Sequence, residues 1–164
     1  MEKFGATFKS NYGKLPIKVQ GTNCSKPIRY FENKGSAQCK SSVMFAALNT
    51  FGETIIKAKR SRDHSELLFK HLKLPIKITR KNKYDIIKIK GKHNIPALNY
   101  KIPSDISSAA FFIVLTALTK NSILKIKNVN VNPSRIGIFY ILKLMGVRIS
   151  KLNIKNYKGE KVAD

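Results

Sequence analysis

The chain has 164 residues, 43% of them hydrophobic, and its 32 lysines and arginines against 9 aspartates and glutamates give a formal net charge of +23. This hydrophobic share supports a packed core and excludes a disordered chain, while the length suits one domain or pieces of two. Because no apolar run approaches the ~18 residues that would cross a bilayer, and residues 1–20 lack a signal-peptide core, we expect a soluble, cytoplasmic protein without a membrane partner.

The first half of the chain predicts two helices, each followed by strands. Residues 36–48, "SAQCKSSVMFAAL", place polar residues before an apolar run and favour a helix, and residues 52–59 alternate as a strand does. After the polar turn "RSRD", residues 64–74 have helical spacing. Two further strands are expected at residues 75–81 and 84–92. The predicted order is therefore helix, strand, helix, strand, strand.

The second half of the chain repeats this order. Residues 104–118 again place polar before apolar residues, and residues 121–131 alternate. The turn "NPSR" leads to helical spacing over residues 136–146 and to strand-like material over residues 147–159. The two halves therefore read as copies of one unit.

A period of about 70 residues relates the two copies and exceeds the small solenoid repeats. Arg62 and Arg135 occupy equivalent places, as do Leu48 and Leu118. Such a period suits an α/β (α+β) chain in which a βαβαββ unit is used more than once. Residues 1–21 echo the tail of the unit, so the chain is expected to start within a repeat and to be an internal piece of a longer protein.

The polar cluster that opens the first predicted helix is a candidate anion site. Ser36 can cap the helix, and Gly35 lets the backbone approach a ligand. The first-turn amides of a helix are free donors with partial positive charge, which attract phosphate or carboxylate. Gln38 adds a neutral donor and acceptor, and Lys40 adds charge nearby. The alternative is that Ser36 and Ser41 only cap a core helix.

The segment "RSRDHSE" closes one strand and opens the next helix. Ser61 or Asp63 is placed to cap that helix, with Glu66 completing a capping box from Asp63. Arg62, at the strand end, can bind a phosphate through two hydrogen bonds or be merely solvated. The sequence leaves both interpretations open.

The second copy has the same kind of openings with different charges. In "NPSRIG", Pro133 fixes the turn and Ser134 is placed to cap, while Arg135 suits either an anion or a carboxylate. The helix that starts in "PSDISSAAFF" is expected to be capped by Ser104 or Asp105. This cluster is acidic where the first one is basic, so the two are not interchangeable.

The cysteines and histidines do not predict a metal site. Cys24 and Cys39 have neither CxxC spacing nor a matching histidine pattern, so we expect reduced thiols. His64 and His71 lie seven residues apart on one predicted helix, which disfavours a metal pair. We interpret both histidines as surface or packing residues.

Four segments of the chain resemble one enzyme family, in the same order and near the family's spacing. They are "GSAQCKSSVMFAALNTFG", "SRDHSELL", "IPSDISSAAFFIVLTAL" and "NPSRIGIFYILKLMG". Together they resemble the middle of 5-enolpyruvylshikimate-3-phosphate synthase, also called 3-phosphoshikimate 1-carboxyvinyltransferase. The resemblance covers almost the whole chain and implies an internal fragment of such an enzyme.

The resemblance implies the enolpyruvyl transferase inside-out barrel, two lobes of three βαβαββ units each, here incomplete. Residues 1–102 would be the C-terminal part of one lobe, and residues 103–164 the start of the return into the second. The family has "PGD" at this crossing, so Ser104 predicts a stiffer hinge. Helix faces that the missing units would cover are expected to be exposed and apolar, which predicts marginal stability or aggregation.

The resemblance also implies an activity. The family transfers the enolpyruvyl group of phosphoenolpyruvate to the 5-hydroxyl of shikimate 3-phosphate, in the shikimate pathway of aromatic amino acid biosynthesis. It uses no cofactor and no catalytic metal, and a full-length enzyme would be a monomer. The expected partners are therefore these two substrates.

Five residues resemble parts of the family's substrate site. Ser36 and Ala37 resemble the pair that binds the phosphate of shikimate 3-phosphate, through a hydroxyl and a backbone amide. Gln38 resembles the residue that contacts both substrates, and Ser61 with Arg62 resembles the strand-end group of the shikimate 3-phosphate site. The family's Lys-Ser motif, Gly-rich loop and proton-transfer residues have no match, so we assign no catalytic residue and expect no turnover from this chain.

Three alternatives stand beside this interpretation. The enolpyruvyl transferase acting on UDP-N-acetylglucosamine shares the fold, but its cysteine lies in a Gly-rich loop, where neither Cys24 nor Cys39 lies. A basic nucleic-acid-binding module would explain the charge, but the lysines are spread through stretches such as "IKIKGK" without interleaved aromatic residues, so we predict no nucleic-acid partner. A non-catalytic scaffold is the third.

Overall fold

The structure is a computed structural model that describes residues 1–164. It divides into two compact units, residues 1–96 and residues 97–164. The lobe assignment made from the sequence, with its boundary between residues 102 and 103, stays a prediction. None of the helices combines the length and the apolar run that a bilayer span requires.

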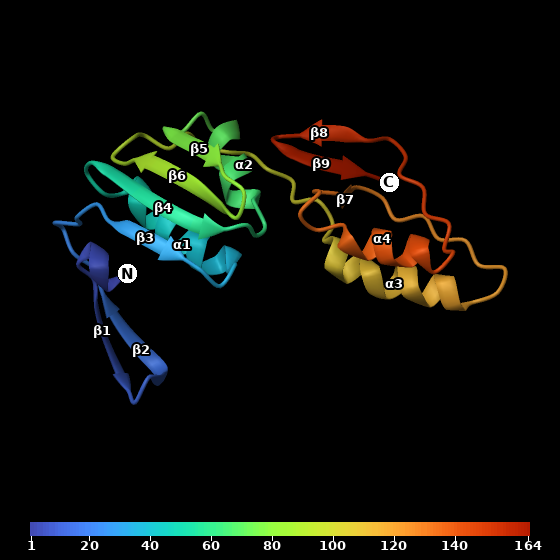
Figure 1. Ribbon diagram of the computed structural model, residues 1–164, viewed down its shortest axis with the longest axis horizontal. Helices are drawn as coiled ribbons and strands as arrows, with labels where there is room; N and C mark the ends of the chain where they lie inside the picture. Colours follow the sequence, from blue (N-terminus) through green and yellow to red (C-terminus); the bar gives the residue numbers. More distant parts are fainter. The chain divides into compact units, whose positions relative to one another are not determined.

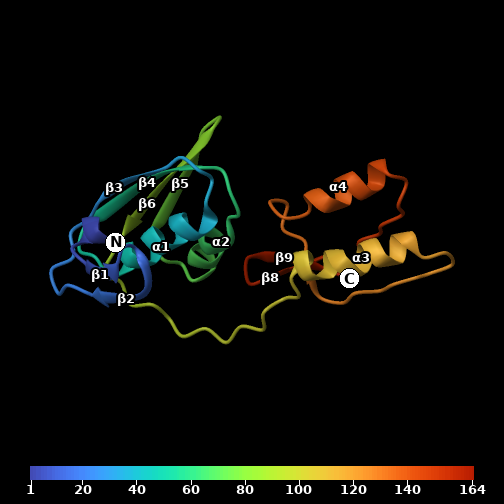
Figure 2. The same ribbon diagram turned by 90° about the horizontal axis from the view of Figure 1, so that it is seen from below.

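The first unit contains one complete βαβαββ motif. Its elements are β3 (Arg29–Glu32), α1 (Ala37–Leu48), β4 (Glu53–Lys59), α2 (His64–His71), β5 (Ile76–Arg80) and β6 (Tyr84–Lys90). The sheet has the order β3-β4-β6-β5, with β3 parallel to β4 and β6 antiparallel to both of its neighbours. Figure 1 and Figure 2 show both helices on the same face of this sheet. The predicted helices and strands of the first copy are confirmed.

The core of this unit lies between the sheet and the two helices. Alternate residues of β4 are buried, as expected for a strand with one covered face. Ile56 of β4 pairs in register with Ile87 of β6, and both are fully buried. Met44 of α1 and Phe69 of α2 pack into the same cluster. This packing fixes where α1 and α2 begin relative to the end of β4.

Strand β3 was missed by the sequence analysis. Its four residues, "RYFE", are too few to show a strand period, and only Glu32 among them is buried. Parallel pairing with β4, from Arg29 opposite Ile55 to Glu32 opposite Ala58, makes the segment a strand. Residues far apart in sequence therefore decide its conformation.

The N-terminal residues form a separate hairpin. After the 3₁₀ turn η1 (Glu2–Phe4), strand β1 (Thr7–Asn11) pairs antiparallel with β2 (Lys14–Gln20). Tyr12 and Gly13 join the strands with positive φ angles of 50° and 74°, as a two-residue hairpin turn requires. Every residue of both strands is exposed.

The second unit repeats the topology in shorter form. Its elements are α3 (Ile106–Leu118), β7 (Val129–Asn130), α4 (Gly137–Leu144), β8 (Lys155–Tyr157) and β9 (Glu160–Ala163). The sheet order is β7-β9-β8, and an isolated parallel bridge joins Ser104 to Val129. Ser104 therefore stands where β3 stands in the first unit. The predicted repeat of a βαβαββ unit is confirmed.

Two strands predicted for the second copy are wrong in extent. Only Val129–Asn130 of the alternating residues 121–131 form a strand, and residues 147–152 form none. Ile123 is 99% exposed, because no neighbouring strand or core covers that segment. Leu152 instead exchanges backbone hydrogen bonds of 2.8 and 2.9 Å with Asp164. A segment with alternating hydrophobic residues forms a strand only where a partner strand is present to pair with it.

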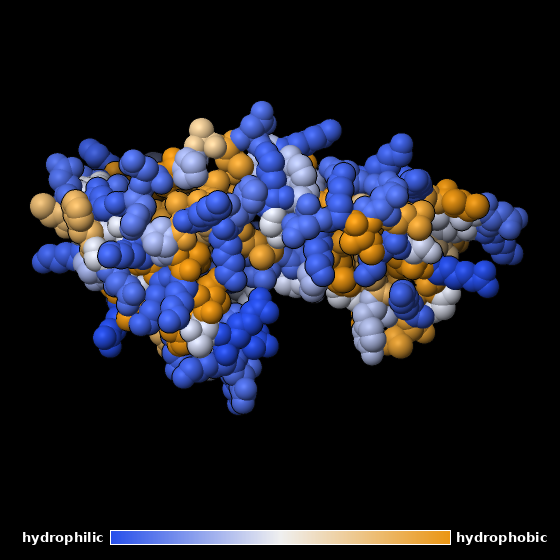
Figure 3. All heavy atoms as spheres, turned by 90° about the horizontal axis from the view of Figure 1, so that it is seen from above, coloured by the Kyte–Doolittle hydropathy of each residue, from blue (hydrophilic) through white to orange (hydrophobic).

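Helices α3 and α4 leave apolar side chains uncovered. On α3, Phe111 and Leu118 are 79% and 80% exposed, and Leu144 of α4 is 69% exposed. In Figure 3, hydrophobic residues gather on the surface of the second unit among hydrophilic ones. The structure therefore has the exposed apolar helix faces that the sequence analysis predicted.

Candidate functional site

The start of α1 is a capped helix N-terminus, and the carboxylate of Glu32 before it accepts hydrogen bonds from the amides of Lys34 and Gly35 at 2.9 and 2.8 Å. Ser36 has extended backbone angles, and its Oγ accepts a hydrogen bond from the amide of Cys39 at 3.2 Å. Gly35, with φ of +76°, turns the chain into the helix. No Asp or Glu lies in the first turn, so the partial positive charge of the helix end is not neutralised there. The predicted cap by Ser36 is confirmed.

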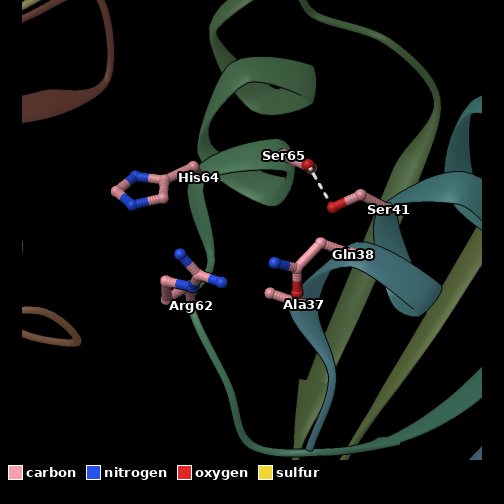
Figure 4. A pocket seen from close by; sticks show the side chains of 6 residues that line it. All are labelled: Ala37, Gln38, Ser41, Arg62, His64 and Ser65. Carbon is pink, nitrogen blue, oxygen red and sulfur yellow. Dashed lines mark hydrogen bonds between the residues drawn. The ribbon is translucent and has the colours of Figure 1, made fainter.

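A hollow of about 200 Å³ lies beside this helix start. Three of its residues come from the first turns of α1, and three come from the segment that leads from β4 into α2. They are Ala37, Gln38, Ser41, Arg62, His64 and Ser65. Figure 4 shows the guanidinium of Arg62 and the side-chain amide of Gln38 pointing toward one another across this hollow. Two separate elements thus contribute to one site.

Arg62 supplies the positive charge of the hollow. Its side chain is half-buried and forms no ion pair or hydrogen bond with the rest of the chain. Gln38, which is exposed, likewise has no side-chain partner. An anion in the hollow would therefore meet a guanidinium with free donors and an amide with free donors.

Lys40 does not contribute charge to the hollow, contrary to the prediction. It is only 2% exposed, and its Nζ lies 2.6 Å from Oε1 of Glu66 on α2. The same Nζ donates to the backbone carbonyl of Arg62 at 2.8 Å. Glu66 is therefore an ion-pair partner, and the predicted capping box is wrong, because Asp63 makes no side-chain cap bond. A buried lysine must be paired, and Glu66 is the acid within reach.

The hydroxyl groups of Ser41 and Ser65 join the two helices beside the hollow. Their Oγ atoms are 2.7 Å apart. Ser41 is thus no cap, contrary to one interpretation of the sequence. Its place in the hollow follows from helical spacing, because it lies three residues after Gln38 and shares that face.

His64 lines the hollow, although the sequence analysis placed it with the surface and packing residues. The signal available in the sequence was its position at the start of α2, two residues after Arg62. A side chain at that position lies on the same helix opening as the arginine. His71, at the other end of α2, is exposed.

Two of the five predicted site residues do not line the hollow. Ser36 directs its hydroxyl to the amide of Cys39 and lies one residue before Ala37. Ser61 lies next to Arg62, and its Oγ is buried without a hydrogen-bond partner. Ala37, Gln38 and Arg62 line it. The structure therefore brings three of the predicted residues to one hollow and places the other two directly before them in the chain.

The equivalent arginine of the second unit is tied to a carboxylate. Asp105 caps α3, with its Oδ2 accepting from the amide of Ser108 at 3.3 Å. Arg135 donates from Nη2 to Oδ1 of Asp105 at 2.7 Å and to Oγ of Ser107 at 2.6 Å. The structure thus selects the carboxylate as the partner of Arg135. Ser134 does not cap α4; its amide and hydroxyl both bond to Oδ1 of Asn132.

The pKa of Asp105 reflects this environment. Burial by itself raises the pKa, but hydrogen bonds from the amides of Ser107 and Ser108 and the charge of Arg135 lower it. Together they bring the pKa below its ordinary value of 3.8. The carboxylate is therefore held in its charged form.

No three His, Cys, Asp or Glu side chains come together as a group that would hold a metal ion. The hollow contains one histidine and no acidic residue. Its chemistry is that of an anion-binding site: free donors, a guanidinium and a helix start.

Comparison with known proteins assigns this architecture. Residues 1–162 match the family model of EPSP synthase (3-phosphoshikimate 1-carboxyvinyltransferase). An EPSP synthase structure from Acinetobacter baumannii superimposes on 99% of the chain with a TM-score of 0.80 and 32% identity. The repeated βαβαββ unit is thus that of the enolpyruvyl transferase fold. The chain belongs to the EPSP synthase family.

Curated relatives are considerably longer than this chain. The 3-phosphoshikimate 1-carboxyvinyltransferase of Ruthia magnifica is 41% identical over 165 aligned positions, which cover 100% of this chain and 37% of the relative. The protein of the same name from Caldicellulosiruptor bescii is 44% identical over 90% of this chain and 34% of its own length. The Acinetobacter baumannii structure is covered over 36% of its length. The chain therefore spans about a third of the proteins it matches.

Proposed function

We propose that this chain carries part of the shikimate 3-phosphate site of a 3-phosphoshikimate 1-carboxyvinyltransferase. The reaction is transfer of the enolpyruvyl group from phosphoenolpyruvate to the 5-hydroxyl of shikimate 3-phosphate, with release of phosphate. The observation that carries the proposal is the hollow in which the unpaired guanidinium of Arg62 faces Gln38 beside the start of α1. Family membership is the second support.

Each residue has a distinct part in this proposal. The first-turn amides at Ala37, with Ser36 before them, would bind the phosphate of shikimate 3-phosphate, because a helix start offers free donors to an anion. Arg62, with Ser61 beside it, would neutralise that charge through a planar pair of donors. Gln38 would orient the substrates through its amide. These contacts hold and align the acceptor, and orientation of two reactants is itself a large part of catalysis.

The chemical step needs groups that we do not assign to this chain. Addition of the 5-hydroxyl to the enolpyruvyl carbon requires proton transfers, and the hollow has no carboxylate or lysine within its lining. We therefore propose that the 164-residue chain does not turn over and binds shikimate 3-phosphate weakly. Action in the cytoplasm, without a cofactor and as a monomer when full length, belongs to the same proposal.

The test is a titration of the chain with shikimate 3-phosphate, followed by amide chemical shifts in NMR spectra. We expect shifts at Ala37, Gln38 and Arg62, and we expect Arg62→Ala to weaken binding by about tenfold or more, the scale of a lost charge-assisted bond. Arg29→Ala is the matched control, because Arg29 is exposed on the strand face away from the helices. Equal losses in both variants would mean that net charge alone attracts the ligand.

A further inference from the structure

Lys40 is unusual in this chain because it is buried. Of the 32 lysines and arginines, it is the only one that is buried, with 2% of its surface exposed. Glu66, its partner, is 4% exposed. The abundance of lysine explains many charges on the surface, but it does not explain one charge inside. Taking a lysine out of water is costly unless its partners compensate, so this position has a specific cause.

The Nζ of Lys40 connects three elements of the first unit. It starts from α1, pairs with Oε1 of Glu66 on α2 at 2.6 Å, and donates to the carbonyl of Arg62 at 2.8 Å. Arg62 lies between β4 and α2, in a segment without helix or strand. Its carbonyl accepts no backbone amide, and the Lys40 ammonium is the donor that holds it.

We propose that Lys40 and Glu66 are positioning residues for Arg62. Glu66 fixes the ammonium of Lys40, the ammonium fixes the carbonyl of Arg62, and the fixed backbone aims the guanidinium into the hollow toward Gln38. Neither Lys40 nor Glu66 lines the hollow, so both act through the arginine. The inference rests on the proposed function, because the hollow is the site whose ligand Arg62 would bind.

Stability alone is a poor explanation for such a pair. Apolar residues of similar volume often replace a buried ion pair with no loss of stability. What they cannot replace is the directed hydrogen bond to a carbonyl group. The contribution of the ion pair that apolar residues cannot replace is therefore the position of the Arg62 backbone.

The decisive experiment is a cycle with the double variant Lys40→Met/Glu66→Leu and with Arg62→Ala, in the whole 164-residue chain. The Met/Leu pair keeps the volume and removes the hydrogen bond to the carbonyl. Shikimate 3-phosphate affinity is measured by NMR titration, and folding by urea unfolding of each variant. We expect the double variant to stay folded and to lose about tenfold in affinity, and to lose nothing further in the Arg62→Ala background.

The other outcomes overturn the inference in distinguishable ways. If Arg62→Ala weakens binding but the double variant does not, or if the two losses add, the pair does not act through Arg62 and the proposed function still stands. If Arg62→Ala leaves binding unchanged, both fail. A double variant that no longer folds would show that the pair serves the fold itself. Lys40→Arg, which keeps the charge and the donors, is expected to retain affinity; a tenfold loss there would contradict the positioning role.

Discussion

Ser36 and Asp105 occupy equivalent positions in the two repeats, one residue before a helix, but only the second repeat has an arginine that pairs with the cap residue. Both side chains cap their helix by accepting an amide three residues ahead. Arg135 is paired with the carboxylate of Asp105, whereas the Arg62 guanidinium lies opposite the neutral side chain of Gln38 and is unpaired. We therefore expect a carboxylate at the cap position of α1 to pair with Arg62, as Asp105 pairs with Arg135.

Ser36→Asp should give the start of α1 an arginine–carboxylate pair like the one between Arg135 and Asp105 at the start of α3. Asp caps a helix as well as Ser does, so we expect a change in stability within about 0.5 kcal/mol. The new carboxylate should attract Arg62 and repel an anionic ligand, and shikimate 3-phosphate binding should be lost. NMR titration and urea unfolding measure the two effects. Retained binding in a folded Ser36→Asp variant would contradict the role of Arg62 as the anion-binding group.

Asp105 predicts a pH dependence for the second unit. Its folded pKa is lowered, so the unfolded chain binds more protons, and the stability contributed by this group is present above the unfolded pKa and lost as the pH falls through the folded pKa. We expect the urea concentration at the unfolding midpoint to decrease when the pH is lowered below about 4. Asp105→Asn should show a shallower decrease over the same range. Identical pH profiles for the two proteins would remove Asp105 as a cause.

At the level of elements, the site depends on how α1 and α2 are joined. The Lys40–Glu66 pair and the Ser41–Ser65 hydroxyl pair both cross between these helices. Both helices also pack on the same face of the sheet, through Met44 and Phe69. The hollow is lined by residues from the starts of both helices. A shift of one helix against the other would therefore change the geometry of the hollow.

Replacing one member of the Lys40–Glu66 ion pair should lower the free energy of unfolding more than replacing both members. Lys40→Met alone leaves the Glu66 carboxylate buried without its cation, and we expect a loss of about 3–5 kcal/mol in the free energy of unfolding. The double variant with Glu66→Leu should recover most of that loss. Urea unfolding of the single and double variants at neutral pH gives the coupling energy directly. A single variant as stable as the parent chain would mean that water reaches the pair.

The exposed faces of α3 and α4 concern the molecule as a whole. The large apolar side chains on these helices meet water directly, and patches of this kind promote association. Phe111 and Leu118 lie on one helix, seven residues apart, and are the most exposed of its apolar residues. The 164-residue chain should therefore aggregate as its concentration rises.

Phe111→Lys with Leu118→Lys should reduce that association. Neither side chain belongs to the core cluster of the second unit, so the thermal midpoint should hardly change. Light scattering over a concentration series measures the association, and Ile106→Lys, at a buried site of the same helix, is the control that should unfold the unit. Unchanged light scattering in the double variant would mean that the chain associates through a surface other than this face of α3.

The local sequence determined the helices, the first-unit strands β4, β5 and β6, the cap at Ser36 and the repeat, because each of these depends on short-range periodicity or on one side chain near a free amide. It left the cap of α3 open between Ser104 and Asp105, and the structure selects Asp105. Only the tertiary structure decided the partners of long side chains and of unsupported strands. Lys40 and Arg62 carry the same charge and have side chains of similar length. Lys40 is buried between two helices and pairs with Glu66, whereas Arg62 lines the hollow and is available to a ligand. No local sequence pattern encodes this difference.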